Sequence, residues 1–271
     1  MAFVELQDGV KLWYIEKGKG TPVVFVHGYW ISSWEFEKEV DYYGQWYRAI
    51  AFDLPGHGKS AKPPKASYTL RWLTASLDAA LNKVVGEEKR VLVGQNMGGM
   101  ISLIYATSPS FAERLKGLVL IGTAAKFKTP ATEYVIVSLK TGETKFKDPV
   151  FHQGGSQAVG FHSRFSKVHP DFVKEFASHT METDQEVALK TYYSMLYDYN
   201  VESKLGGIRV PTLILTGDKD NLILPQNSKY LHEHIKNSEL VVLSPDIGHH
   251  IQFEATDQFH KSLLNFLKKV S

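Results

Sequence analysis

The sequence predicts an α/β fold, in which a mostly parallel sheet of eight strands is flanked by helices. Short apolar runs rich in β-branched residues recur along the chain, and stretches with helical periodicity separate them. The later runs are apolar throughout, as expected for strands that are covered on both faces. With 271 residues, the chain has enough material for one such domain with an insertion.

The strands are predicted from runs of apolar and β-branched residues. Their expected ranges are 2–7, 10–16, 22–26, 47–52, 90–95, 117–122, 210–216 and 239–243. The first two flank Asp8-Gly9, a strong turn signal, and should form an antiparallel hairpin. The later strands alternate with helices, which predicts parallel pairing through right-handed crossovers.

Four core helices are expected at residues 69–85, 96–107, 225–236 and 256–268. In the first of these helices, Thr69 is a suitable N-cap. Apolar residues of the same helix share one stripe, and these are Leu70, Leu73, Leu77, Leu81 and Val84. This pattern predicts a helix that packs one face on the sheet.

Residues 125–206 interrupt the alternation of strands and helices. This segment has no convincing buried strand, and it offers helical stretches near 169–182 and 184–199. We therefore expect an α/β core from residues 1–124 and 207–271, with residues 125–206 folded over the sheet as a helical cap.

Composition excludes several classes of function. A net charge of +2 is too small to indicate nucleic acid or an acidic membrane as a partner. The chain has no cysteine, which excludes a thiolate nucleophile, and we expect no metal and no cofactor. No window approaches the roughly 18 apolar residues of a membrane span, and the first residues do not resemble a signal peptide. We expect a cytoplasmic protein.

The segment VLVGQNMGG at residues 91–99 has the pattern of a strand that turns sharply into a helix. In such a turn the central residue, here Asn96, is held in a strained conformation and exposes its side chain. Gly94 and Gly98 remove Cβ atoms that would clash. Taken alone, the pattern also fits an ordinary glycine-rich turn in which Asn tolerates a positive φ.

Other segments at strand ends favour a reactive site. VVFVHGYW at residues 23–30 can bring the N–H of Tyr29 opposite that of Met97, and two such donors make an oxyanion hole. LILTGDKD at 213–220 presents two carboxylates, and VVLSPDIGHHIQFE at 241–254 presents two histidines. A histidine held by a carboxylate can activate a nucleophile or water. His27 and His57 are expected to order their loops.

These segments together resemble the α/β-hydrolase fold superfamily over essentially the whole chain, and in particular its small serine carboxylesterase and lactonase branch. The segments on which this resemblance rests are VHG at 26–28, DLPGHGKS at 53–60, GQNMGG at 94–99, VPTLILTGDKD at 210–220 and GHHIQFE at 248–254. The resemblance implies that Asp220 is the acid, His249 the base, and Tyr29 and Met97 the oxyanion-hole donors. It also implies that Asn96 stands at the nucleophile position.

The family carries Ser, or sometimes Asp or Cys, where this chain has Asn96. One account is a serine enzyme of the ester or lactone class that Asn has inactivated. A second is a dehalogenase or epoxide hydrolase whose Asp nucleophile is replaced by Asn. In the family's haloalkane dehalogenases a Trp comes directly after the nucleophile, whereas here that residue is Met97. A third is a native Asn, in a non-covalent enzyme or a ligand-binding receptor.

Aromatic residues are concentrated in the expected cap, which favours a small apolar ester or lactone as substrate. The phenylalanines of this region include Phe151, Phe161, Phe165, Phe172 and Phe176. We expect Trp30, Tyr192 and Phe161 to line the substrate pocket.

Overall fold

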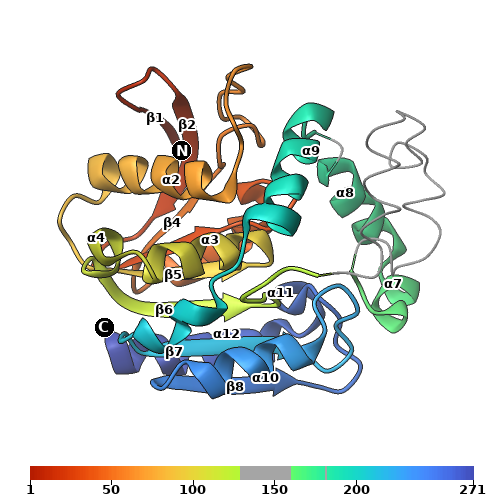
Figure 1. The fold of residues 1–271 in the computed structure, drawn as a ribbon. Helices are drawn as coiled ribbons and strands as arrows, with labels where there is room; N and C mark the ends of the chain where they lie inside the picture. The colour runs from red at the N-terminus through yellow and green to blue at the C-terminus, as the bar shows by residue number, and fades with distance from the viewer. Residues whose placement is uncertain (129–159, 181) are drawn as a thin grey trace.

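The computed structural model describes residues 1–128, 160–180 and 182–271. Within them, one eight-stranded sheet has the order β1-β2-β4-β3-β5-β6-β7-β8, and helices cover both of its faces (Figure 1). The pairs β1–β2 and β2–β4 are antiparallel, and every other neighbouring pair is parallel. The predicted fold class is confirmed.

All the predicted strands are present, with small shifts at their ends. Their bounds are β1 Ala2–Glu5, β2 Lys11–Lys17, β3 Pro22–Val26, β4 Arg48–Phe52, β5 Arg90–Gln95, β6 Leu115–Ile121, β7 Thr212–Gly217 and β8 Ser238–Leu243. The hairpin turns at Asp8-Gly9, where Gly9 has a φ of 79° that favours glycine.

The core helices are α1 Glu37–Tyr43, α2 Leu70–Val84, α3 Met97–Ala106, α4 Pro109–Ala112, α10 Pro225–His234, α11 Ile251–Glu254 and α12 Thr256–Val270. As predicted, Thr69 caps α2, because its side chain accepts a hydrogen bond from the N–H of Trp72. Helix α1 was not predicted, and it follows a single turn of 3₁₀ helix at Ser33–Phe36. Both are too short to show clear periodicity.

Two hydrophobic cores lie on opposite faces of the sheet. In β3, Val23 and Phe25 belong to the core beneath α1 and α12, whereas Val24 and Val26 belong to the core beneath α2, α3 and α10. Successive side chains of a strand point to opposite faces, so every residue of β3 is buried. This double coverage explains why the central strands are continuous apolar runs.

The segment between β6 and β7 supplies helices α7 Ser163–Val168, α8 Pro170–Thr180 and α9 Gln185–Tyr193, and α9 continues into a π-helical turn at Ser194–Asp198. These helices lie beyond the carboxyl ends of the parallel strands (Figure 1). The stretch predicted at 169–182 begins at Pro170, and a further short helix precedes it because proline starts a new helix readily.

The two ends of this segment lie side by side. Lys126 and Asn200 form an antiparallel bridge, and the N–H of Val201 donates to the carbonyl of Ala125 at 2.9 Å. The chain therefore leaves and re-enters the core at one place, which supports residues 125–206 as a cap. That division stays a proposal, and Phe151 lies outside the described residues.

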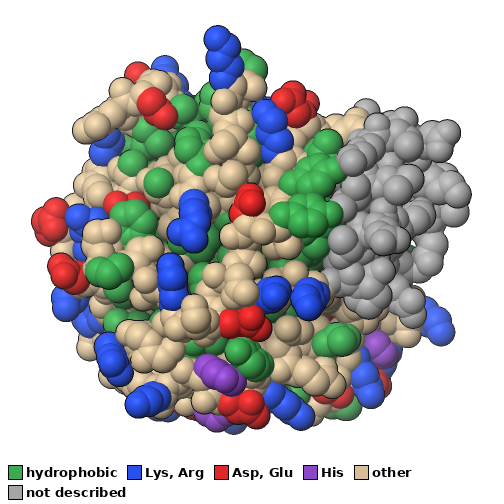
Figure 2. Space-filling view, in the orientation of Figure 1, with side chains coloured by type: hydrophobic (Ala, Val, Ile, Leu, Met, Phe, Trp, Pro, Cys, Tyr) green, Lys and Arg blue, Asp and Glu red, His purple; other side chains and the backbone are tan. Residues whose placement is uncertain are grey.

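Within the described part of the chain, no helix has both the length and the apolar character required to cross a bilayer. On the face shown in Figure 2, basic and acidic side chains are interspersed, without a large area of one sign. This mixture agrees with the small net charge of +2.

Candidate active site

The turn between β5 and α3 has the sharp geometry that its sequence predicts. Asn96 adopts φ 52° and ψ −114°, a region that non-glycine residues rarely occupy. A Cβ on Gly94 would collide with the carbonyl of Gly98, and a Cβ on Gly98 would collide with the carbonyl of Val26. The two glycines therefore allow strand and helix to meet at an acute turn, with Asn96 at its tip.

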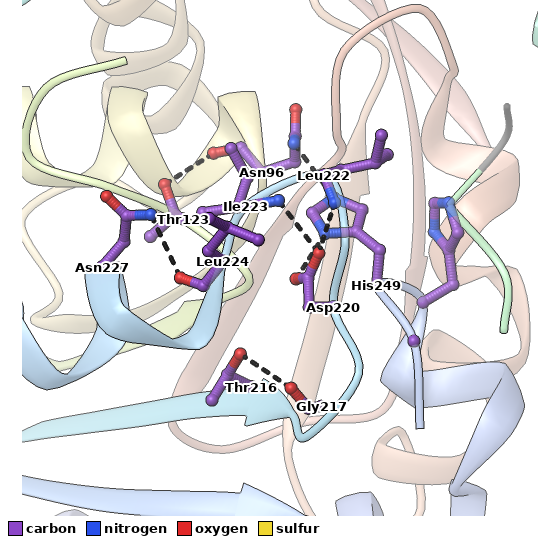
Figure 3. Close-up of polar contacts among 12 residues, drawn as sticks. Asn96, Thr123, Thr216, Gly217, Asp220, Leu222, Ile223, Leu224, Asn227 and His249 are labelled. Carbon is purple, nitrogen blue, oxygen red and sulfur yellow. Dashed lines mark hydrogen bonds and ion pairs between the residues drawn. The ribbon is translucent and has the colours of Figure 1, made fainter. Parts of the chain in front are cut away.

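Hydrogen bonds fix the backbone of Asn96. Its N–H donates to the carbonyl of Ile121 at 2.9 Å, and its own carbonyl accepts from the Thr123 hydroxyl at 2.8 Å (Figure 3). Both partners belong to the end of the neighbouring strand β6 or to the loop after it. Such anchoring holds the strained conformation in place.

His249 and Asp220 form a buried pair in the loops after β8 and β7. The Nδ1 atom of His249 lies 2.7 Å from Oδ2 of Asp220 (Figure 3). The other carboxylate oxygen accepts the N–H groups of Leu222 at 3.0 Å and Ile223 at 2.9 Å. Because this carboxylate can only accept, Nδ1 of His249 carries the proton and its Nε2 lone pair is directed away from Asp220.

The surroundings of His249 determine its basicity. Burial on its own lowers the pKa of this imidazole, but the charge of Asp220 and the hydrogen bond to it raise the pKa. The more distant charges of Glu35 and Glu254 act in the same direction, and the net pKa lies above the ordinary value. His249 is therefore a buried base that can take up a proton.

The carboxamide of Asn96 lies between His249 and two backbone N–H groups. Its Oδ1 accepts from the N–H of Met97 at 2.8 Å and from that of Tyr29 at 3.4 Å. Its Nδ2 lies 3.0 Å from Nε2 of His249. The backbone groups can only donate, so they fix the oxygen on their side and the NH₂ group on the histidine side. The two N–H groups predicted for an oxyanion hole thus converge on the Asn96 oxygen.

The sequence interpretation missed Glu35, which positions the loop that carries Tyr29. This fully buried carboxylate accepts the N–H of Gly28 at 2.7 Å and the Nε2 amide of Gln252 at 3.2 Å. His27 contributes from the other side, since its Nδ1 bonds the carbonyl of Gly28 at 2.8 Å. A single acidic residue among aromatic neighbours gave no pattern from which this role could be predicted.

Glu254 was also missed, and it fixes the loop of His249. Its Oε2 accepts the N–H of Gly248 at 3.0 Å and that of His162 at 2.9 Å. The backbone N–H of His249 also donates to the carbonyl of Gly160 at 2.8 Å. The histidine loop is therefore joined to the segment that precedes α7.

The three residues predicted to line the pocket lie in different surroundings. The rings of Trp30 and Tyr192 each lie 5.7 Å from that of Tyr29 between centroids, in tilted orientations, and the N–H of Tyr29 faces Asn96. Phe161 is fully buried, and its ring lies 4.6 Å from that of His250 and 5.1 Å from that of Phe176. Its contacts are those of a packing residue, and the pocket roles of all three stay predictions.

His27 and His57 are buried beside the site, and no carboxylate of the described residues is a hydrogen-bond partner of either. Nε2 of His27 accepts the N–H of Leu54 at 3.1 Å, and Nδ1 of His57 lies 3.1 Å from the carbonyl of Pro55. Both side chains bond backbone and order their loops, as expected. The described residues also contain no group of His, Cys, Asp and Glu side chains suited to holding a metal ion.

Comparison with known proteins gives a match to a family and to several named enzymes. The sequence profile described as alpha/beta hydrolase fold matches residues 21–256. A proline iminopeptidase from Thermoplasma volcanium is 25% identical over 81% of this chain and 79% of its own length. Lipase 3 from Moraxella sp. is 27% identical over 97% of this chain and 84% of its own length.

Solved structures show the same fold. A thermophilic esterase from Thermogutta terrifontis superposes with a TM-score of 0.88 at 23% identity, over 100% of this chain and 99% of that one. An enol-lactonase from Burkholderia xenovorans superposes with a TM-score of 0.85 at 21% identity, over 98% and 100% of the two chains. At these identities the similarity establishes the architecture.

Proposed function

This chain belongs to the α/β-hydrolase fold family, and we propose that it carries an acyl-hydrolase site of the carboxylic ester and lactone class with Asn96 at the nucleophile position. The observation that carries the proposal is the continuous series Asp220–His249–Asn96, joined at 2.7 Å and 3.0 Å. It aligns a base with the tip of the turn, as nucleophilic acyl transfer requires. Relatives and structural neighbours are named as hydrolases, which supports the enzyme class.

Each group has a defined role in this proposal. His249 removes a proton from a nucleophile at position 96 and later returns it to the leaving group. Asp220 holds the imidazole in the required tautomer and stabilises its cationic form. The N–H groups of Tyr29 and Met97 stabilise the oxyanion, and water finally releases the acid.

The carboxamide of Asn96 prevents this sequence in two ways. Its nitrogen lone pair is delocalised into the carbonyl, so Nδ2 is a poor nucleophile. Its oxygen also occupies both N–H donors, at 2.8 Å and 3.4 Å, so a substrate carbonyl must displace it. We therefore propose that the chain with Asn96 is an inactive or atypical form of the hydrolase.

The Asp-nucleophile alternative is supported by the same carboxamide geometry. Aspartate has nearly the shape of asparagine, so a carboxylate at position 96 would place one oxygen against the N–H groups of Tyr29 and Met97. Its second oxygen would face Nε2 of His249. The test of function therefore includes both Asn96→Ser and Asn96→Asp.

Replacing Asn96 tests the proposal directly. We expect Asn96→Ser to hydrolyse short p-nitrophenyl esters and simple lactones on the order of a thousandfold faster than Asn96→Ala. The alanine variant is the matched control, because it frees the two N–H donors without supplying a nucleophile. Initial rates on a series of acyl chain lengths provide the measurement.

Equal rates for folded Asn96→Ser and Asn96→Ala would contradict the ester and lactone proposal. In that case, release of halide from haloacids or opening of epoxides by Asn96→Asp would establish the alternative. If neither variant shows activity on these substrates while the Asn96 chain binds small carbonyl compounds, the protein is a ligand-binding receptor or a non-covalent enzyme.

The proposed partner is a small apolar ester or lactone. The rings of Trp30, Tyr192 and Tyr29 form an aromatic group, and the backbone N–H of Tyr29 faces the Asn96 carboxamide, which supports an apolar substrate. The cytoplasmic location rests on the sequence alone and remains part of the proposal.

A further inference from the structure

The Asn96 carboxamide is held as an acyl-hydrolase site would hold a substrate. Its oxygen lies in the pair of N–H groups, at 2.8 Å from Met97 and 3.4 Å from Tyr29. The atom that would leave, Nδ2, lies 3.0 Å from the histidine nitrogen that could protonate it. Carbonyl polarisation and leaving-group protonation are the two requirements of amide hydrolysis.

We propose that the site hydrolyses the side chain of Asn96 itself, which converts residue 96 to aspartate with release of ammonia. The inference shares His249 and Asp220 with the proposed function, but it does not depend on the class of external substrate. It makes position 96 a site of self-modification.

The reaction needs water as its only co-reactant. A water oxygen bonds to Cγ of Asn96, and the carbonyl electron pair moves to Oδ1, where Met97 and Tyr29 donate to it. One water proton passes through His249 to Nδ2, and the C–N bond breaks as the pair reforms the carbonyl. The remaining acid proton goes to ammonia, so carboxamide and water yield carboxylate and ammonium.

The environment supplies the proton and access for water. The carboxylate of Asp220 and its hydrogen bond counteract burial and raise the pKa of His249, which favours uptake of a proton from water. Asn96 keeps 9% of its surface exposed, whereas His249 is 1% exposed. Asn96 is therefore more accessible to water than the histidine beside it.

The competing cyclic route of asparagine deamidation is hindered here. That route requires the backbone nitrogen of Met97 to attack Cγ of Asn96. The N–H of Met97 is instead donated to Oδ1 at 2.8 Å, and Met97 is the first residue of α3. Direct hydrolysis gives only α-linked aspartate, whereas the cyclic route also gives the β-linked isomer. The product therefore identifies the route.

The product would have a different chemical character from the starting chain. One carboxylate oxygen would keep the N–H groups of Tyr29 and Met97, and the other would face His249. A carboxylate in this place can act as a nucleophile, which the carboxamide cannot. Self-hydrolysis would thus convert the atypical residue into a reactive one.

The test is mass spectrometry of the full chain incubated at neutral pH in water labelled with heavy oxygen. Trypsin cuts after Arg90 and Arg114, which isolates the peptide 91–114 with Asn96. We expect one heavy oxygen at position 96, in α-linked aspartate only. Neighbouring Gln95 is the internal control, because it is a buried carboxamide without a hydrogen bond among the described residues. Exposed Asn237 reports ordinary deamidation.

His249→Gln should slow the conversion at least about a hundredfold. His232→Gln is the matched control, since His232 is exposed on α10 and should leave the rate unchanged. Asp220→Asn provides a second variant if His249→Gln does not fold. If the parent chain is already converted when purified, retention of the carboxamide in His249→Gln supports the proposal.

Two results would overturn the inference. One is an Asn96 carboxamide that persists as long as that of Gln95. The other is a mixture of α- and β-linked products that forms equally fast with and without His249. Neither result affects the esterase test of Asn96→Ser, and failure of that test leaves the mass measurement valid.

Discussion

His249 and the pair His27 and His57 are equally buried, yet their chemistry differs. Burial lowers the pKa of His27 to about 4 and that of His57 to about 3, and their rings lie 5.0 Å apart. Burial also acts to lower the pKa of His249, but the charge and hydrogen bond of Asp220 raise it above the ordinary value.

The comparison shows that a buried histidine becomes a base only with a charged partner. His27 and His57 bond backbone atoms, and what they gain from protonation is smaller than the loss of hydration. His249 has a carboxylate at 2.7 Å, which stabilises its cationic form. The first two histidines stay neutral and shape loops, while His249 can exchange protons with a group at position 96.

Removal of the partner carboxylate should give the largest effect. In the Asn96→Ser background we expect Asp220→Asn to lower kcat about a thousandfold, because the imidazole loses its fixed tautomer and the stabilisation of its cation. The pH of half-maximal activity should also fall, since the main cause that raises the pKa of His249 is gone. Rates across a pH series measure both effects.

Asp218→Asn is the matched control for that variant. Asp218 lies two residues away, and within the part of the chain that the structure describes its carboxylate accepts only backbone N–H groups, those of Ile247 at 2.8 Å and Asp246 at 3.3 Å. We expect it to retain the rate and the pH profile of the folded enzyme. Equal losses from the two variants would remove the special role assigned to Asp220.

The neutral histidines should make the fold sensitive to acid. Their pKa values in the folded state lie below the unfolded value of 6.5, so the unfolded chain binds more protons as the pH falls. The contribution of the neutral histidines to the free energy of unfolding is fully present above pH 6.5 and declines toward pH 4. For His27 this loss is on the order of 3 kcal/mol. Urea unfolding across this range measures the loss.

His57→Gln separates this effect from general acid denaturation. The variant removes one of the two titrations, so its free energy of unfolding should fall less steeply with decreasing pH than that of the parent. An identical slope in the two proteins would mean that His57 is protonated in the folded state.

The sequence predicted the elements whose signals are local. Continuous apolar runs located the strands, and Gly94 and Gly98 located the sharp turn because their missing Cβ atoms are required there. Glu35 could not be predicted, because its role depends on Gly28 and Gln252, which are brought to it only by the fold. Residue order alone gives no sign of such a contact.

The orientation of the Asn96 carboxamide lay beyond prediction for the same reason. Three segments determine it, namely the loop of Tyr29 after β3, the start of α3 and the histidine loop after β8. The sequence indicated that each segment belonged to a site. Only their arrangement in space shows that the carboxamide oxygen accepts from the N–H groups of Met97 and Tyr29.

The central claim is that the site has the groups that acyl transfer requires, apart from a nucleophile at position 96. The most direct measurement is the intact mass of Asn96→Ser after incubation with an organophosphorus ester, a reagent that labels activated serine hydroxyls. We predict one phosphoryl group, located at position 96, and far slower labelling when Asp220→Asn is added. A folded Asn96→Ser protein that stays unlabelled, or that labels equally fast without Asp220, would contradict the account.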